Sequence, residues 1–342
     1  METVHTIVVG REAMGCRFEV IFNLLDNSVA TSIGTDALNI IEHIEEQISV
    51  DRPSSEIAGI NESSSTRWHD LSPDVFDLLL LAKQLHSQTN GAFDVTTGPL
   101  IKAWGFLQKQ GRTPSPEKLV EAVACSGMKN VEFHEHEHKI RFQQPDVEIN
   151  LGAIGKGWAI DKAIDHIDME GIENFLIHGG HSSVRSRGTR GLAGQQTGRD
   201  GWPVGLRHPL LREKRIGTIT LQNKALGTSG SGTQFFIEKG QKIGHILDPR
   251  TGQPASGVLS ATVLADTAAE ADALATAAYI LGPQEIDHIA PDGSSVAAIL
   301  VVQEERTSRL TAILANLDTE EFVPNQTTPG LTVIQAKDHS QK

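Results

Sequence analysis

The chain has 342 residues, with 39% hydrophobic and 21% charged side chains, which is typical of a globular protein long enough for one or two domains. Its 30 basic and 43 acidic residues give a formal net charge of −13, and no basic cluster stands out. This charge argues against a nucleic-acid partner, because binding to a phosphate backbone requires concentrated Lys and Arg.

The sequence also limits the cellular setting. No apolar run approaches the roughly 18 residues that a membrane span requires, and residues 1–11 lack the basic and apolar regions of a signal peptide. We therefore expect a cytoplasmic protein, or an exported or membrane-anchored one if a leader has been removed. The two cysteines, Cys16 and Cys125, are too few for a disulfide framework or a thiolate metal cage. Both are expected to be buried filling residues.

The hydrophobic pattern predicts interleaved strands and helices. In chain order they are two strands within 6–25 around a turn at Met14-Gly15, helices at 37–50, 75–86 and 117–124, a hairpin with its tip at His134–His138, a strand at 147–151, a helix from Gly157, strands at 174–177, 203–207, 215–221 and 258–264, a helix at 268–281, and a strand at 296–302. The order has no regular strand–helix–strand rhythm, which favours a mixed α+β fold over a doubly wound sheet. From about Thr327 the chain is polar and is expected to fray.

Asp272 and Thr276 form the first candidate site. They lie four residues apart in an alanine-rich helical pattern, so both oxygens should share one face of a largely buried helix. A buried carboxylate needs a partner, and a cation would serve. The alternative is a solvated face, or a hydroxyl bonded back to the main chain.

A second candidate site is the segment Gly244–Gly252, which combines an imidazole, a carboxylate and a guanidinium. A type I turn explains Asp248, Pro249 and Gly252, but it does not explain His245 or Arg250. A neutral His can take a proton from a hydroxyl nucleophile. Together with the Asp/Thr pair, the segment suggests a magnesium-assisted reaction at a phosphate.

Three weaker motifs have simple structural explanations beside their functional ones. The glycine-rich joint Gly152–Gly157 could approach a phosphate or a metal, or it could be a tight turn, and it matches neither a Rossmann nor a Walker pattern. The aromatics of Gly91–Leu100, with Trp104 and Phe106, could face a flat ligand or fill a core. The histidines of His134–His138 could bind transition metals, but an exposed hairpin tip explains them better.

Taken in order, these segments resemble the FAD:protein FMN transferases, the ApbE family. The resemblance covers residues 10–305 and implies an α+β fold with mixed sheets and packed helices. In it, residues 1–326 would form one catalytic unit with two lobes, and residues 327–342 a polar tail. The matching segments are Met14-Gly15, Ser55, Asn61, Gly91–Thr96, Trp104–Phe106, Leu151–Asp161, Gly179-Gly180, Thr228–Gly230, Gly244–Gly252 and Ala271–Thr276.

The resemblance implies a flavin transferase that uses FAD as its substrate. Such enzymes cleave the pyrophosphate of FAD and move FMN to a Thr or Ser hydroxyl of an acceptor protein, releasing AMP. The acceptor would carry an Asp-x-x-Thr/Ser-Gly-Ala-Thr/Ser motif. The transfer needs neutralisation of the phosphate charge, a held nucleophile and a proton acceptor. The same residues would serve an FAD pyrophosphatase that gives FMN and AMP, and a non-catalytic flavin-binding protein is the other alternative.

The resemblance also implies a role for each candidate residue. Asp272 and Thr276, with the carbonyl of Ala153, would hold Mg²⁺, an all-oxygen ligand set that suits this hard ion. His245 would deprotonate the acceptor hydroxyl. The other implied residues are Asp248 and Arg250, which would shape the loop of the base, and Met14, Ala92, Phe93, Asp94, Asn150, Lys156 and Ile246, which would line the FAD site.

Four positions depart from the family pattern around the expected flavin pocket. Cys16 stands where Thr usually follows Met-Gly, and Asp51 stands where an aromatic usually precedes Arg-Pro. His181 replaces the usual Asp after Gly-Gly, and Ser231 the common Tyr after Thr-Ser-Gly. The expected metal and base positions are all retained.

Overall fold

The computed structural model describes residues 6–23, 27–63, 67–107, 111–191, 200–211, 213–230, 232, 234–304, 309–318, 321–325 and 330–339. The chain divides into two compact units. The first is built from three segments, Met1–Glu45, Lys156–Ser229 and Gly257–Lys342, and the second from two, Glu46–Gly155 and Gly230–Ser256.

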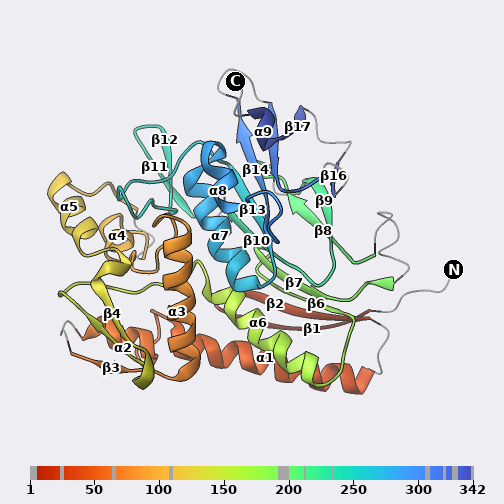
Figure 1. Ribbon diagram of the computed structural model, residues 1–342, viewed down its shortest axis with the longest axis horizontal. Helices are drawn as coiled ribbons and strands as arrows, with labels where there is room; N and C mark the ends of the chain where they lie inside the picture. Colours follow the sequence, from red (N-terminus) through yellow and green to blue (C-terminus); the bar gives the residue numbers. More distant parts are fainter. Residues whose placement is uncertain are drawn as a thin grey trace. The chain divides into compact units, whose positions relative to one another are not determined.

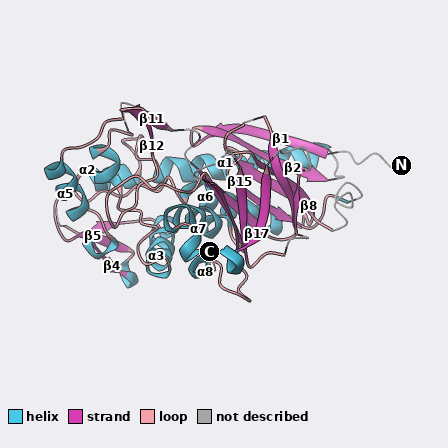
Figure 2. Cartoon of the chain, turned by 90° about the horizontal axis from the view of Figure 1, so that it is seen from above, coloured by secondary structure: helices cyan, strands magenta, loops and turns pink. Residues whose placement is uncertain are grey.

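A nine-stranded sheet is the framework of the first unit (Figure 1, Figure 2). Its strands, in spatial order, are β1 (Thr6–Ala13), β2 (Cys16–Asn23), β6 (Phe175–Gly179), β7 (Ser183–Arg187), β10 (Ala225–Gly230), β13 (Ser260–Ala265), β14 (Ala297–Gln303), β15 (Leu310–Ala315) and β17 (Leu331–Gln335). The first four are antiparallel neighbours, whereas β15 and β17 run parallel. Met14 and Gly15 form the β1–β2 turn with φ of 48° and 68°, the left-handed conformation that a two-residue hairpin turn favours.

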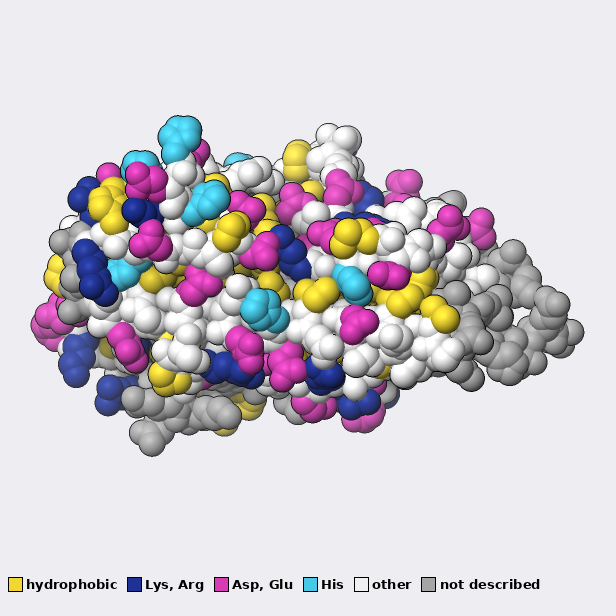
Figure 3. All heavy atoms as spheres, turned by 90° about the horizontal axis from the view of Figure 1, so that it is seen from below, with side chains coloured by type: hydrophobic (Ala, Val, Ile, Leu, Met, Phe, Trp, Pro, Cys, Tyr) yellow, Lys and Arg dark blue, Asp and Glu magenta, His cyan; other side chains and the backbone are white. Residues whose placement is uncertain are grey.

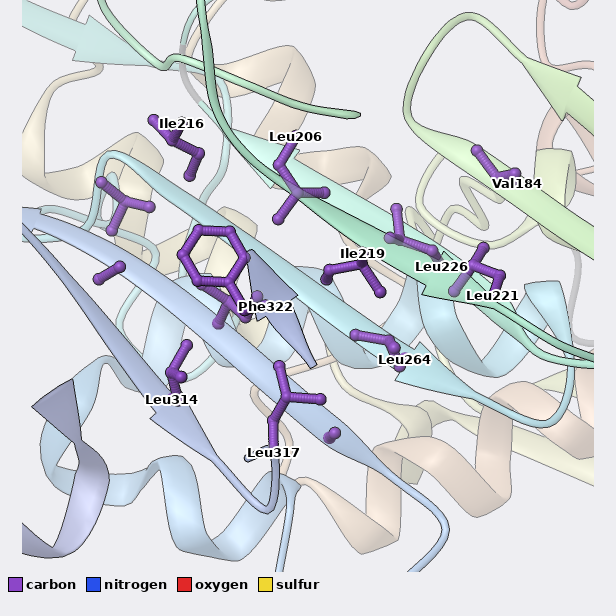
Figure 4. Close-up of a cluster of buried hydrophobic side chains, with 14 of the residues drawn as sticks. Val184, Leu206, Ile216, Ile219, Leu221, Leu226, Leu264, Leu314, Leu317 and Phe322 are labelled. Atoms are coloured by element: carbon purple, nitrogen blue, oxygen red, sulfur yellow. The ribbon is translucent and has the colours of Figure 1, made fainter. Parts of the chain in front are cut away.

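The main core of the first unit lies between this sheet and a smaller one. The smaller sheet has the order β16 (Phe322–Pro324), β9 (Arg215–Leu221) and β8 (Trp202–Arg207). Figure 4 shows side chains of both sheets in one cluster, with Leu206, Ile219 and Phe322 from the small sheet and Leu264 and Leu314 from the large one. This burial of apolar area stabilises the unit.

Helices of the first unit include α6 (Gly155–Met169), which starts at the boundary, α7 (Ala268–Leu281), α8 (Ile286–Ile289) and α9 (Ala336–His339), and α1 (Asn27–Ile48) begins in it. Helix α7 packs against β7, β13 and β14 and carries the expected Asp/Thr pair. Thr267 caps it by accepting a hydrogen bond from the Glu270 N–H, and the Glu270 carboxylate accepts one from the Thr267 hydroxyl. The alanines of α7 are buried, so the helix is enclosed rather than amphipathic.

The second unit combines short helices with small sheets. Its helices are α2 (Glu56–Glu62), α3 (Pro73–Gln88), α4 (Gly98–Ala103) and α5 (Pro116–Ala124), and its strands are β3 (His69–Asp70), β4 (Val131–His134), β5 (Lys139–Phe142), β11 (Phe235–Glu238) and β12 (Gln241–Gly244). A separate apolar core forms around Leu100, Trp104, Phe106, Ala122 and Leu247.

The predicted mixed α+β class is confirmed, as are the helices near 75–86, 117–124 and 268–281. The strand predicted at 147–151 is wrong. The side-chain amide of Asn61 donates to the Ile149 carbonyl and accepts from the Ile149 N–H, both at 2.8 Å, so a side chain takes the place of a neighbouring strand. The predicted fraying tail is also wrong over 331–339, where β17 and α9 form.

The surface agrees with the composition. Acidic and basic side chains are interspersed over the face in Figure 3. Over the described ranges, none of the helices has the length and apolar character to cross a membrane. Cys16 and Cys125 are free thiols that are half-buried, not fully buried as expected.

Candidate functional site

Asp272 lies in the second turn of α7 with 7% of its surface exposed. Its Oδ2 atom accepts a hydrogen bond of 2.7 Å from the Ser183 hydroxyl and one of 2.9 Å from the Gly157 backbone N–H. Burial raises the pKa of Asp272 to about 7, although the positive charge of Lys156 and these two hydrogen bonds oppose the rise. The charged form of this carboxylate is therefore poorly compensated by the protein alone.

Thr276 follows Asp272 by one helical turn on the same side of α7. Its hydroxyl donates to the Asp272 carbonyl oxygen at 3.3 Å and lies 2.9 Å from the Ser229 hydroxyl oxygen. The sequence left open whether the two oxygens share one face of a buried helix or the hydroxyl bonds back to the main chain. The geometry shows both. The pair shares a helix face, and the Thr hydroxyl bonds back to the main chain.

These groups fit a hard cation such as Mg²⁺. Within the described part of the chain, Ser183 and Gly157 both donate to Oδ2, so Oδ1 is the carboxylate oxygen left to a cation, and the Thr276 hydroxyl supplies a neutral oxygen. A buried carboxylate with a raised pKa gains most from a positive charge nearby. Ala153, the third expected ligand, belongs to the second unit and lies half-buried in the turn before α6.

His245 directly follows β12 in the second unit and is half-buried. Its Nδ1 atom lies 3.0 Å from the Gln234 carbonyl oxygen, which also accepts the His245 backbone N–H at 3.3 Å. Because a carbonyl oxygen can only accept, Nδ1 carries the ring proton in the neutral imidazole and Nε2 carries the lone pair. The ring also packs edge-on against Phe106, with centroids 6.4 Å apart. This geometry makes Nε2 the atom that could take a proton.

Asp248 and Arg250 shape the loop after His245. The Asp248 carboxylate accepts hydrogen bonds of 2.9 Å from the backbone N–H, Nε and Nη2 of Arg250. The expected turn is present, because the Thr251 and Gly252 N–H groups both bond the Asp248 carbonyl. Gly252 has φ of 71°, which suits a glycine.

Two of the expected flavin residues, Ala92 and Phe93, are enclosed, with 0% and 1% exposure. Phe93, like Trp104 and Phe106, is therefore a core aromatic, as the simpler explanation held.

The Asp94 carboxylate is occupied by contacts within the second unit. Its Oδ1 accepts from the Thr96 N–H at 2.7 Å and the Thr96 hydroxyl at 2.6 Å. Its Oδ2 accepts from the Met128 N–H at 3.2 Å and lies 3.0 Å from His86 Nδ1. The hydrogen bond to Asp94 raises the pKa of His86. Asp94 therefore holds a loop together and orients His86.

The remaining expected residues are divided between the units. Asn150 is half-buried, and its Oδ1 accepts a hydrogen bond of 3.0 Å from the Gly152 N–H. Met14 and Lys156 are half-buried in the first unit, and Ile246 is buried in the second. The first unit thus holds Met14, Lys156, Asp272 and Thr276, and the second holds Ala92, Phe93, Asp94, Asn150, Ala153, His245, Ile246, Asp248 and Arg250.

Two of the four departures from the family pattern are neighbours. Cys16 and His181 lie at the turns of hairpins whose strands β2 and β6 are paired, and a Cβ atom added to Gly180 would lie 2.9 Å from the Cys16 sulfur. His181 is exposed with φ of 63°. Asp51 is exposed, and Ser231 lies outside the described residues.

The sequence did not reveal the groups that hold the candidate residues. Ser183 belongs to no recognisable motif, and its position shortly after Gly179-Gly180 is the one available signal. Gly157 and Gln234 contribute main-chain atoms, which have no side-chain signature. The histidine-rich tip at His134–His138 is exposed, as expected. Within the described part of the chain, no group of three or more His, Cys, Asp or Glu side chains is placed to hold a metal ion.

Known proteins resemble this chain over most of its length. The model of the ApbE family matches residues 14–300. An FAD:protein FMN transferase of Klebsiella pneumoniae is 28% identical over 303 residues, which covers 87% of this chain and 84% of that protein. The one from Escherichia coli K12 is 29% identical over 248 residues, 71% of this chain and 69% of that protein.

Solved structures share the fold. The ApbE protein of Thermotoga maritima superposes with a TM-score of 0.76 and 28% identity, over 87% of this chain and 94% of its own. The flavin transferase ApbE of Vibrio cholerae gives 0.76 and 24% identity, over 92% of this chain and 98% of its own. These matches include segments from both compact units.

Proposed function

The chain belongs to the ApbE family, and on this premise we propose that it transfers FMN from FAD to a Thr or Ser hydroxyl of an acceptor protein, releasing AMP with the help of Mg²⁺. Relatives named FAD:protein FMN transferase match most of the chain. The observation that carries the proposal is the buried Asp272 carboxylate, with Thr276 one turn away and Oδ1 left to a cation.

The reaction exchanges a phosphoanhydride bond of FAD for a phosphate ester bond to the acceptor. The acceptor oxygen bonds to the phosphorus of the FMN part, and the bond from this phosphorus to the bridging oxygen breaks. AMP leaves with the bridging oxygen. A bound Mg²⁺ would neutralise phosphate charge during this exchange. Asp272, Thr276 and the Ala153 carbonyl are the proposed ligands.

His245 is the proposed base. Its Nδ1 faces the Gln234 carbonyl, so Nε2 is the nitrogen that takes the proton of the acceptor hydroxyl as the new ester bond forms. Asp248 and Arg250 hold the shape of the loop through their mutual hydrogen bonds. The proposed acceptor carries the Asp-x-x-Thr/Ser-Gly-Ala-Thr/Ser motif.

One assay tests the proposal and separates it from its alternatives. The protein is incubated with FAD and Mg²⁺, with and without an acceptor domain that carries the motif, and AMP and protein-bound flavin fluorescence are followed. Covalent flavin on the acceptor together with AMP supports the transferase. AMP that forms equally without acceptor supports a pyrophosphatase, and retained FAD without AMP supports a flavin-binding protein. Either of these last two results overturns the transferase proposal.

A further inference from the structure

The Asp272 side chain is held by two neighbouring elements of the first unit. Ser183, the first residue of β7, donates to Oδ2 from a side chain that is 0% exposed. Gly157, in the first turn of α6, donates to the same oxygen from its backbone. The last torsion of an Asp side chain has broad preferences. The orientation of this carboxylate is therefore set by its hydrogen bonds.

A second carboxylate, that of Asp161, also links β7, α6 and α7, through residues that lie further along β7 and α6. Arg185 lies two residues after Ser183 on β7, and Asp161 lies four residues after Gly157 on α6. Each pair thus shares one side of its element. Arg185 Nη1 donates to Asp161 Oδ1 at 2.5 Å, and the Asp161 carboxylate accepts the N–H groups of Ala268 and Ala269 at 2.8 and 2.9 Å. Asp161 thereby accepts hydrogen bonds from backbone N–H groups in the first turn of α7 that have no partner within the helix.

Close backbone packing joins α6 to α7, and the Arg185–Asp161 contact joins β7 to α6. A Cβ atom at Gly157 would lie 2.1 Å from the Ala268 carbonyl oxygen, so α6 and α7 approach each other too closely for any side chain there. With α6, α7 and β7 held in this way, the position of the Ser183 hydroxyl relative to Asp272 is set by the fold.

We propose that Ser183 is a positioning residue for the metal site: its hydroxyl fixes the Asp272 carboxylate so that Oδ1 is presented to a divalent cation. This inference rests on the proposed function, because it takes Asp272 as a metal ligand. Residues that orient a ligand in this way typically change metal affinity by 10–100-fold when they are removed. Ser183 therefore acts on metal affinity and not on the chemistry of the transfer.

The test is Mn²⁺ binding to the full chain, followed by electron paramagnetic resonance of the free ion, in the wild type, Ser183→Ala and Asp272→Ala. Ser186→Ala is the matched control, because Ser186 is on the same strand, is also 0% exposed, and bonds the Lys224 carbonyl. We expect Ser183→Ala to raise the Mn²⁺ dissociation constant about 10-fold. The transfer rate at saturating metal should stay close to that of the wild type. Ser183→Thr, which keeps the hydroxyl, should restore the affinity.

The possible results separate this inference from the proposed function. Equal Mn²⁺ affinity of the wild type and Ser183→Ala overturns the positioning role alone. Equal losses in Ser183→Ala and Ser186→Ala overturn it as well, because the effect would then be general to the strand. If the wild type binds no Mn²⁺, or Asp272→Ala binds it as well as the wild type does, the proposed metal site itself is wrong, and the role of Ser183 with it.

Discussion

The Trp104 indole nitrogen donates a hydrogen bond of 2.8 Å to the Gly252 carbonyl oxygen. Trp104 follows α4 and is 3% exposed, whereas Gly252 closes the loop that contains Asp248 and Arg250. A buried aromatic residue of one segment thus holds the backbone of another segment that lies about 150 positions away. The shape of the candidate catalytic loop depends on this contact as well as on its own turn.

Replacing Trp104 with Phe should therefore destabilise the second unit. The ring would remain apolar, but the buried Gly252 carbonyl would lose its donor, at a cost of about 1–3 kcal/mol. A urea titration followed by far-UV circular dichroism measures this cost. Trp68→Phe, at a half-buried position, is the control and should change stability by less than about 1 kcal/mol. Equal effects of the two variants would show that the hydrogen bond is unimportant.

His245→Ala should remove general base catalysis. We expect FMN transfer to fall about 10²–10⁴-fold, because Nε2 would no longer accept the hydroxyl proton. Single-turnover transfer to an acceptor domain measures the rate, and FAD binding, followed by flavin fluorescence, should stay close to that of the wild type. A transfer rate within a few-fold of wild type would show that another group is the base.

Asp272→Ala should abolish the response of the reaction to Mg²⁺. The substitution removes the carboxylate that is proposed to bind the ion, while the Thr276 hydroxyl remains. AMP release measured across a range of Mg²⁺ concentrations tests this. Normal activity with an unchanged Mg²⁺ dependence would exclude Asp272 as a ligand.

Gly157→Ala should disrupt the packing of α6 on α7. The added Cβ atom would overlap the Ala268 carbonyl, and overpacking of this kind costs about 3 kcal/mol. The matched control is Gly59→Ala on α2, where nothing lies within 4 Å of the added atom. This control should stabilise the protein by about 0.5–1 kcal/mol, because alanine favours a helix. Opposite shifts of the thermal midpoint are expected, and a neutral Gly157→Ala would contradict the close approach.

The His86–Asp94 contact should make stability depend on pH. The hydrogen bond between His86 and Asp94 raises the pKa of His86 in the folded state above the ordinary value of about 6.5. The folded state thus binds the proton more tightly, so the stabilisation is fully present below about pH 6.5 and is lost as the pH rises through the folded pKa. Urea unfolding of the wild type and His86→Ala from pH 5.5 to 8.5 tests this. The difference between them should shrink as the pH rises, and a constant difference would contradict the prediction.

Much of the fold could be predicted from apolar runs and periodicity, but the hydrogen-bond partners of an extended segment could not. Helix α7 and strand β14 are nearly all apolar, and their lengths are clear from the sequence. The 147–151 segment has a strand-like composition, yet at Ile149 the Asn61 side chain takes both main-chain hydrogen bonds in place of a neighbouring strand. Only the tertiary structure shows such a substitution, because the two residues lie far apart in sequence.

The candidate site shows the same limit. The buried helix that carries Asp272 and Thr276 and the turn that follows His245 could be predicted, because spacing and residue type are visible in the sequence. The Ser183 hydroxyl and the Gln234 carbonyl could not, because their roles come from the pairing of elements and from main-chain atoms. The four contacts that hold the Asp94 carboxylate within its own unit could not be predicted either.

Strand β17 has a practical consequence for anyone who shortens this protein. It pairs in parallel with β15, whose residues Leu310–Ala315 are all buried. A version that stops at residue 326, where composition alone would end the domain, would lack β17. The edge of β15 that now pairs with β17 would then have no neighbouring strand. Unprotected edges of this kind recruit other chains. Such a truncated protein should be recovered largely as insoluble aggregate, even though every residue proposed for catalysis would still be present.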